Sequence, residues 1–393
     1  MECFKLFFKN TFLIILLNSI LMNSCRAQKP IIEAAQRTQQ YVPLLKGKKI
    51  GLVTNQTSVI YHPKGHTHLV DSLLKLNVHI SRIFSPEHGF RGNVDAAKYI
   101  QNSTDTKTGL PIISLYGKRK KPTPKDLENI DLMVFDIQDV GVRFYTYIST
   151  LHYIMEACAE NNIPLLVLDR PNPNGHYVDG PTLNPKYSSF VGKHPVPLVY
   201  GMTIGEYAQM INGENWLKNK IKCDLKVIPL AHYTHHKTYH LTIKPSPNLP
   251  NDTAINLYPS LGFFEGTPIN AGRGTNYQFQ RYGSSKFPQH LFKYYPKSNV
   301  GSQYPKDKGK VCYGVLLHQT PRQNQVNLEW LIDAYHKYPD KQTFFGKTFT
   351  IHAGDTILKH QISRGSTAKE IQKTWQKDLE NFKKIRHQYL IYP

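Results

Sequence analysis

The chain has 393 residues, and 40% of them are hydrophobic, which is enough for buried cores and for two domains of roughly 100–200 residues each. Its 26 prolines and 25 glycines are spread out without a repeat or a low-complexity tract, which excludes a disordered or fibrous chain. Lysine and arginine outnumber aspartate and glutamate by 49 to 28, and the resulting charge of +21 is typical of proteins with a polyanionic partner.

The first residues, 1–27, are typical of a secretory signal peptide. Lys5 and Lys9 precede an apolar run, 12–22, that is shorter than the roughly 20 residues needed to span a bilayer. Cleavage after Ala27 would release a soluble protein, whereas cleavage before Cys25 would make a bacterial lipoprotein with a lipid anchor on that cysteine. We therefore predict an exported protein, either periplasmic or membrane-anchored. Export argues against nucleic acid as the partner and favours a carboxylate-rich polymer of the cell envelope.

Three cysteines follow this segment, namely Cys158, Cys223 and Cys312. They are far apart and odd in number, which excludes a dense disulfide scaffold, and none belongs to a CxxC metal-binding motif. We predict that they are buried free thiols.

Short apolar runs alternate with helical stretches from residue 49 to residue 173. Strands are predicted at 49–55, 78–85, 110–117, 131–139 and 163–173, and helices at 66–76 and 143–162. This alternation predicts an α/β fold with a parallel sheet, and the near-continuous apolar strands indicate that both faces of the sheet are covered. The first strand is not followed by GxGxxG, so we expect a Rossmann-like topology that does not bind a dinucleotide.

Polar residues follow four of these strands at the point where each strand ends. In open parallel sheets, ligands bind beyond the carboxyl ends of the strands, so we predict a site at this edge. The residues concerned are Asn55 after the first strand, Glu87 and His88 after the second, Asp136 and Asp139 after the fourth, and Asp169, Arg170 and Asn172 after the fifth.

The segment 83–92, IFSPEHGFRG, places three ionisable groups among glycines and a proline. Glu87, His88 and Arg91 suit a site that the backbone and a ligand approach closely. Two simpler interpretations remain open. The segment is a polar surface turn, or Glu87 is a structural carboxylate that pairs with Arg91.

The regular alternation of apolar strands and helices ends beyond residue 200. A helix is predicted at 202–217 and a strand at 223–230, and the Pro/Asn-rich stretch 244–260 reads as a crossing between domains. The segment 261–275 holds one carboxylate, Glu265, and one guanidinium, Arg273. We predict a Rossmann-like domain at 28–245 and a smaller C-terminal α/β domain at 246–393. The latter includes a strand at 311–320, a helix at 327–338, and a last helix with a capping box at Thr367 and Glu370 and a core stripe at Ile371, Trp375, Leu379 and Phe382.

Four histidines in the segment 232–240 raise the possibility of a zinc site. No HExxH motif is present and the stretch contains no carboxylate, so we predict exposed histidines and no metal. The residues are His232, His235, His236 and His240.

The motifs together resemble the exo-β-N-acetylmuramidase family, a glycoside hydrolase family that was long a domain of unknown function. The resemblance covers the chain from about Lys48 to Pro393, and its long motifs are specific. One departure is Tyr200, where the family commonly has histidine. The motifs are GLVTNQTSV, FSPEHGFRG, LYG, FDIQDVGVRFYTYIST, LDRPNPNG, GMTIGEYA, NLPN, LYPSLGFFEGTPINAGRGT and a C-terminal W…L…F…R…YLIY.

The resemblance implies an exo-acting enzyme of cell-wall recycling that releases N-acetylmuramic acid from the non-reducing end of peptidoglycan fragments. It also implies a Rossmann-like domain and a smaller C-terminal domain with the site in a cleft between them. Neither a metal nor an organic cofactor is implied.

Glycoside cleavage needs an acid for the leaving oxygen and, usually, a second group at the anomeric carbon. We choose Glu87 as the acid and Glu265 as its partner, with Asp136 and Asp139 as rivals, and the acetamido group of the substrate is an alternative nucleophile. Retaining and inverting mechanisms both remain open. Arginine suits the lactyl carboxylate of muramic acid better than lysine does. Substrate binding is predicted for Arg143, Arg170 and Arg273 at that carboxylate, for Asn55, Tyr145 and Asn172 at hydroxyl and acetamide groups, for His88 and Arg91 beside the acid, and for Asp169 and Thr275 at the same site.

Two other functional classes stay open. A non-catalytic binder of envelope glycans would keep the site but would not need Glu87. A hydrolase of another peptidoglycan bond, such as an amidase or esterase, is less favoured because the chain has no GxSxG elbow.

Overall fold

The computed structural model describes residues 29–87, 89–91, 103–117 and 119–393. Its contacts group Ile32–Pro393 into one compact unit, and all of the architecture below belongs to that unit. No helix in the described part of the chain combines the length and the apolar character that crossing a membrane requires.

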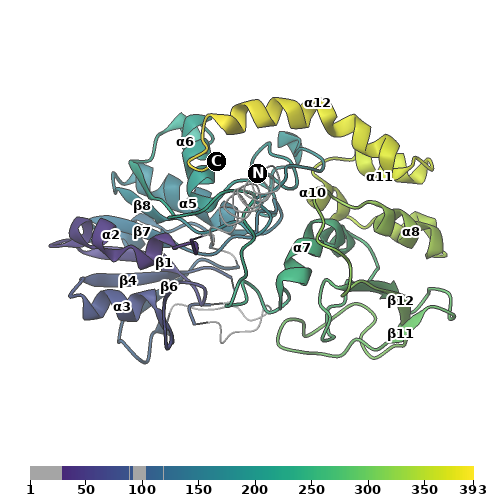
Figure 1. Cartoon of the computed structure of the whole chain (residues 1–393), viewed down its shortest axis with the longest axis horizontal. Helices are drawn as coiled ribbons and strands as arrows, with labels where there is room; N and C mark the ends of the chain where they lie inside the picture. The colour runs from purple at the N-terminus through teal and green to yellow at the C-terminus, as the bar shows by residue number, and fades with distance from the viewer. Residues whose placement is uncertain (1–28, 88, 92–102, 118) are drawn as a thin grey trace, which may run out of the picture. The chain divides into compact units, whose positions relative to one another are not determined.

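A seven-stranded sheet forms the centre of the N-terminal part, with the strand order β5-β6-β4-β1-β7-β8-β9 (Figure 1). Every neighbouring pair is parallel except β5 and β6 at one edge, so the predicted parallel sheet is confirmed. The strands are β1 (Ile50–Thr54), β4 (Ile80–Ser85), β5 (Ser103–Thr104), β6 (Pro111–Ser114), β7 (Leu132–Asp136), β8 (Leu165–Leu168) and β9 (Leu225–Ile228).

Helices cover both faces of this sheet, as the apolar strands predict. On β1, Val53 faces the core that includes α5 (Tyr147–Glu160) and α6 (Ile204–Gly213). Its neighbour Leu52 faces a second core, because successive side chains of a strand point to opposite faces. That second core contains residues of α2 (Thr38–Leu45) and α3 (Leu69–Lys75).

The predicted helix 66–76 begins later than expected. Residues before it form a hairpin of β2 (Val59–His62) and β3 (Gly65–His68), and Gly65 has a φ of 131° that favours glycine at the turn. The helix α3 starts at Leu69, where the His68 ring accepts a hydrogen bond from the backbone N–H of Val70.

The second half of the stretch 244–260, interpreted as a crossing between domains, is helical. Helix α7 occupies Asp252–Leu261, and the side chain of Asn251 caps it by accepting from the N–H of Ala254. Pro259 lies inside the helix near its end. The composition suggested a linker because Asn and Pro are also the residues that begin and end helices.

The C-terminal part is a smaller α/β region built on an antiparallel sheet of order β10-β12-β11 (Figure 1). Its strands are β10 (Arg281–Ser284), β11 (Phe292–Tyr294) and β12 (Cys312–Leu316). The remaining helices are η1 (Ala34–Gln36), α4 (Pro124–Leu127), η2 (Pro185–Tyr187), η3 (Lys218–Lys220), η4 (Gly262–Gly266), α8 (Glu329–Lys337), α9 (Lys341–Phe344), α10 (Phe349–Ala353), α11 (Ile357–Ser363) and α12 (Ala368–His387).

The last helix, α12, confirms its sequence prediction and leads the chain back to the large sheet. Thr367 and Glu370 form the capping box, and the predicted apolar stripe is buried. Beyond α12, the chain end lies near α6 in Figure 1, and the Tyr389 hydroxyl donates to the Glu214 carboxylate at 2.6 Å. The three cysteines are buried free thiols, as predicted.

Candidate active site

Glu87 lies just beyond the end of β4 and next to the start of α5. Its backbone carbonyl accepts from the Tyr147 hydroxyl at 3.4 Å, and this hydroxyl accepts from the side-chain amide of Asn55 at 2.9 Å. Thr146 Oγ1 stands 3.5 Å from the carboxylate atom Oε2, a long and weak contact. The end of β1 therefore positions Glu87 through Tyr147, while the hydrogen bond of its carboxylate in the described structure is weak.

A second carboxylate, Glu265, lies in η4 and forms an ion pair with Arg273, with 2.9 Å between Oε1 and Nε. Burial raises the pKa of the Glu265 carboxyl, but the charges of Arg273, Lys306 and His352 outweigh it and hold the pKa below its usual value. Glu265 is therefore ionised at neutral pH.

Tyr258 of α7 connects the two carboxylates. Burial raises the pKa of its phenol far above the usual value, and the charges of Glu265 and Glu87 both add to that rise. The same two carboxylates raise the pKa of Arg273 against the effect of burial. Tyr258 and Arg273 therefore lie within electrostatic reach of both carboxylates, and we call the four residues Glu87, Tyr258, Glu265 and Arg273 the Glu87–Glu265 cluster.

Aromatic packing holds the two sides of this cluster together. Phe144, in the loop before α5, meets Tyr258 edge to face with 5.0 Å between ring centroids. Its ring also lies against Gly262, where an added Cβ would come within 2.2 Å of the Phe144 ring. Only glycine allows this close approach of η4 to the loop before α5.

Asp136 and Arg170, two of the residues predicted at the strand ends, lie inside the fold. Arg170 Nε donates to Asp136 Oδ1 at 2.6 Å, and its NH1 group donates to Glu33 Oε2 at 2.7 Å. Asp136 is 0% exposed and Arg170 is 2% exposed. We correct both predicted roles, because these side chains neutralise one another in the interior, and we assign them to the fold rather than to substrate.

Arg143 is a further correction. It is fully buried, and its two terminal guanidinium nitrogens donate to the backbone carbonyl oxygens of four residues. These N–H donors are therefore already used and are not available to a lactyl carboxylate. The four acceptors are Pro181, Val196, His352 and Ala353. Arg143 therefore fixes the backbone at His352, whose ring faces Phe144 at 5.6 Å.

Arg91 does not pair with Glu87. Its guanidinium forms ion pairs with Asp71 at 3.1 Å and with Asp105 at 2.8 Å. The alternative interpretation of Glu87 as the structural partner of Arg91 is therefore wrong, and so is the placement of Arg91 beside the acid. His88 lies outside the described residues.

Asp139, the second predicted rival for the partner carboxylate, is buried beside Tyr200. It is 4% exposed, and its Oδ2 accepts from the Tyr200 hydroxyl and from the N–H of Gly141. Its Oδ1 is buried and has no hydrogen-bond partner in the described structure. Burial raises the pKa of Asp139 to about 6, and its charge reaches Tyr147 and Tyr258.

The other predicted binding residues make internal hydrogen bonds. Asn172 donates to the carbonyl of Met202, and the Tyr145 hydroxyl donates to the carbonyl of Pro245 at 2.7 Å. Asp169 accepts from the Tyr392 hydroxyl at 2.6 Å, which ties the chain end to the sheet, and burial raises its pKa to about 7.

Thr275 closes the turn that carries Arg273. Gly272 and Gly274 flank this arginine with φ angles of 78° and 77°, in the region that favours glycine. Thr275 Oγ1 donates to the carbonyl of Gly272 at 2.7 Å. The turn predicted from the glycines is therefore present, and it presents Arg273 to Glu265.

The histidine segment holds three exposed side chains, as predicted, and one exception. His235 is buried because its ring reaches the Glu206 carboxylate at 2.9 Å, a partner far away in sequence. Among the described residues, no group of three His, Cys, Asp or Glu side chains has an arrangement that could hold a metal ion.

Sequence reasoning missed several residues around the two carboxylates. Thr146 and Tyr147 lie in the quoted motif FDIQDVGVRFYTYIST, so their position after a strand was an available signal. Tyr258 lies in the helix that was predicted as a crossing. Lys306 comes from a loop and His352 from the short helix α10, both distant in sequence from Glu265.

Two protein-family models match the chain. The model for the N-terminal part of exo-beta-N-acetylmuramidase NamZ matches residues 50–253, and the model for its C-terminal part matches residues 256–392. The chain belongs to the exo-β-N-acetylmuramidase NamZ family. The resemblance drawn from the motifs is confirmed, and the Glu87–Glu265 cluster takes Glu87 from the N-terminal NamZ region and its other members from the C-terminal one.

Individual relatives agree with this family. The chain is 38% identical to the peptidoglycan beta-N-acetylmuramidase NamZ of Bacillus subtilis strain 168, over 93% of this chain and 92% of that protein. A crystal structure of a DUF1343 family protein from Bacteroides fragilis NCTC 9343 is 44% identical with a TM-score of 0.86, covering 93% of this chain and 99% of that one. A second DUF1343 protein from the same strain is 30% identical with a TM-score of 0.78, covering 92% and 99%.

Proposed function

We propose that this protein is an exo-acting glycoside hydrolase that releases N-acetylmuramic acid from the non-reducing end of peptidoglycan fragments. The observation that carries the proposal is the pair of carboxylates, Glu87 and Glu265, assembled around one arginine and one tyrosine in a NamZ-family chain. Two carboxyl groups at the scissile bond are the usual equipment of glycoside hydrolysis.

The two carboxylates have different environments, which suits different roles. Among the described residues, the Glu87 carboxylate has only the weak hydrogen bond from Thr146, which suits a group that protonates the leaving oxygen. Glu265 is kept ionised by Arg273 and Lys306, so it suits the stabilisation of positive charge at the anomeric carbon or the orientation of the acetamido group.

Arg273 suits the lactyl carboxylate. Its Nε lies 2.9 Å from Glu265 Oε1, and its guanidinium carbon lies 5.5 Å from the centroid of the Phe279 ring. A fork of guanidinium donors matches a carboxylate. Its side chain is 32% exposed, which leaves it accessible to a ligand.

We expect Arg273→Ala to lower the preference for muramic acid over glucosamine. A charge-assisted hydrogen bond contributes about 1.5–3 kcal/mol, so the ratio of kcat/KM for the two chromogenic glycosides should fall by about 10- to 100-fold. Freeing Glu265 from its partner lowers both activities, and for this reason the ratio is the quantity to measure. Equal losses on both glycosides would show that Arg273 serves only Glu265.

The proposed activity itself is tested with a chromogenic N-acetylmuramic acid glycoside and its N-acetylglucosamine counterpart. Release of the chromophore from the first, and little release from the second, is expected. Binding of the sugar without release would favour a non-catalytic glycan binder. Cleavage of amide or ester bonds in muropeptides, with the glycoside intact, would favour a hydrolase of another bond.

Export remains part of the proposal, and Cys25 supplies its test. If a lipid is attached to this cysteine, Cys25→Ala should move the protein from the membrane fraction to the soluble fraction. An intact mass that places the mature N-terminus at Gln28 would contradict the lipoprotein form and support a soluble, periplasmic protein.

A further inference from the structure

We propose that a pocket around Arg281 binds a carboxylate on the part of the substrate beyond the scissile bond, an inference that rests on the proposed function. The pocket has a volume of about 430 Å³ and lies on the C-terminal part of the chain. We call it the Arg281 pocket. Its lining residues that the argument uses are Thr275, Tyr277, Arg281, Lys297 and Asn299.

Arg281 is a buried cation without an anion. Only 5% of the residue is exposed, its Nε has no hydrogen-bond partner, and no ion pair of its guanidinium is present in the described structure. The guanidinium carbon lies over the rings of Tyr277, Phe292 and Tyr294 at 4.6, 5.2 and 4.9 Å. Aromatic rings attract a cation, but they do not replace the hydrogen bonds that the guanidinium makes with water when it is exposed. Burying the guanidinium without hydrogen-bond acceptors therefore costs free energy, and a bound ligand would supply those acceptors.

The fold places this cation next to the Glu87–Glu265 cluster. Gly272 precedes Arg273, and an added Cβ at Gly272 would come within 2.9 Å of Arg281 Cγ, so the glycine makes room for the arginine stem. One turn therefore presents Arg273 towards Glu265 and borders the Arg281 pocket through Thr275 and Tyr277. No member of the cluster lines the pocket, so a group bound there belongs to a part of the substrate away from the reacting carbon.

The pocket also contains an acceptor without a donor. Asn299 Oδ1 is buried and has no partner in the described structure, and Lys297 is exposed at the same pocket. An unpaired guanidinium beside an unpaired amide oxygen matches a carboxylate that has an N–H group close to it. In a peptidoglycan strand, carboxylates beyond the first two sugars belong to the lactyl group of the next muramic acid or to a peptide attached to it.

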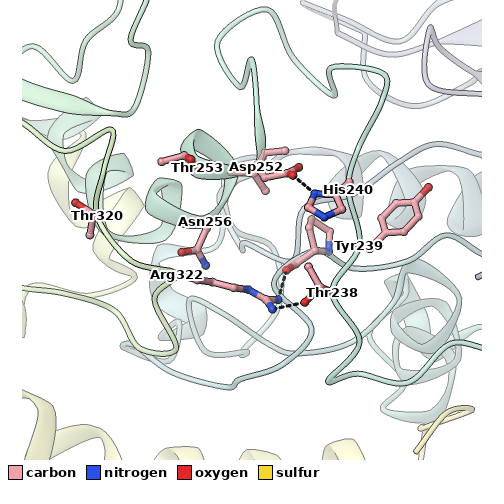
Figure 2. Close-up of a pocket in the computed structure, with 10 residues that line it drawn as sticks. Thr238, Tyr239, His240, Asp252, Thr253, Asn256, Thr320 and Arg322 are labelled. Carbon is pink, nitrogen blue, oxygen red and sulfur yellow. Dashed lines mark hydrogen bonds and ion pairs between the residues drawn. The ribbon is translucent and has the colours of Figure 1, made fainter. Parts of the chain in front are cut away.

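A second pocket contains an arginine whose guanidinium does have hydrogen-bond acceptors in the protein (Figure 2). It has a volume of about 160 Å³, and Arg322 at its edge donates to Thr238 Oγ1 at 3.0 Å and to the carbonyl of Pro173 at 3.2 Å. His240 in the same pocket is paired with Asp252. Because the Arg322 guanidinium already has hydrogen-bond acceptors, we propose no anion there, and Arg322 serves as the control.

The test compares four substrates in wild type, Arg281→Gln, Arg281→Lys and the control Arg322→Gln. The chromogenic muramic acid glycoside and the disaccharide of muramic acid and glucosamine carry no carboxylate beyond the scissile bond. A tetrasaccharide with a second muramic acid carries one, and its peptide-substituted form carries the peptide carboxylates instead.

For Arg281→Gln we expect kcat/KM on a tetrasaccharide to fall by about 10- to 100-fold, mainly through KM, while the two short substrates remain unchanged. Arg281→Lys should recover part of the loss, and Arg322→Gln should show none. Loss on the peptide-free tetrasaccharide identifies the lactyl carboxylate as the ligand, and loss on the peptide-substituted form alone identifies the peptide.

Thermal unfolding provides a readout that distinguishes binding from folding. Arg281→Gln removes an unpaired buried charge, so its Tm should be equal to or higher than that of wild type. A lower Tm with equal losses on all four substrates, or no loss on either tetrasaccharide, would overturn the inference. If wild type does not cleave the chromogenic glycoside, the proposed function fails, and calorimetric binding of the tetrasaccharides to the same variants then still decides the role of Arg281.

Discussion

Glu87→Gln should abolish most of the glycosidase activity while leaving the fold intact. General acid catalysis typically contributes about 10²–10⁴-fold, and an amide of the same shape has no proton to give to the leaving oxygen at neutral pH. The contact that fixes this residue runs from Tyr147 to its backbone carbonyl, so the substitution leaves it in place. The measurement is kcat on the chromogenic muramic acid glycoside.

The matched control is Glu128→Gln, which makes the same chemical change at an exposed glutamate at the end of α4. It should have wild-type activity. A loss of about tenfold or less in Glu87→Gln would reject Glu87 as the acid, because it falls below the usual contribution of such a group. A clear drop in Tm together with the lost activity would instead point to a structural carboxylate.

The sequence alone predicts the large sheet well. Its strands are near-continuous apolar runs, and a parallel strand that is buried on both faces requires that composition, so β1, β4, β7 and β8 appear where expected. The hairpin before α3 and the helix α7 were missed because their signals are turn and capping residues such as Gly65 and Asn251, which also occur in plain loops.

The candidate site was predicted only in part, for a physical reason. A carboxylate after a strand looks the same in sequence whether it faces a ligand or an internal cation. Glu87 and Asp136 both follow apolar strands, but only the fold reveals that Asp136 meets Arg170, and that Arg170 meets Glu33 from the start of the chain. Arg281 shows the converse, since nothing near it in sequence indicates that its guanidinium has no anionic partner in the described structure.

The buried network of Glu33, Asp136 and Arg170 should be a major determinant of stability. Arg170→Met removes the cation and leaves two buried carboxylates facing each other, and breaking a buried ion pair in this way costs about 3–5 kcal/mol. The measurement is the free energy of unfolding from denaturant titration. Arg91→Met is the control, because its ion pairs with Asp71 and Asp105 are partly solvated and should contribute about 1 kcal/mol or less.

The loss of stability in Arg170→Met should increase as the pH rises. Burial already raises the pKa of Glu33 and of Asp136 in the native protein although the charge of Arg170 lowers it, so removing Arg170 raises both further. A carboxyl whose pKa is higher in the folded state than in the unfolded state stabilises the fold below its unfolded pKa, and this stabilisation disappears as the pH rises through the folded pKa. The free energy of unfolding of the variant should therefore be closest to that of wild type in mildly acidic buffer, and the difference should be largest above neutral pH. A deficit that stays constant with pH, or one no larger than that of Arg91→Met, would show that the two carboxylates do not depend on Arg170.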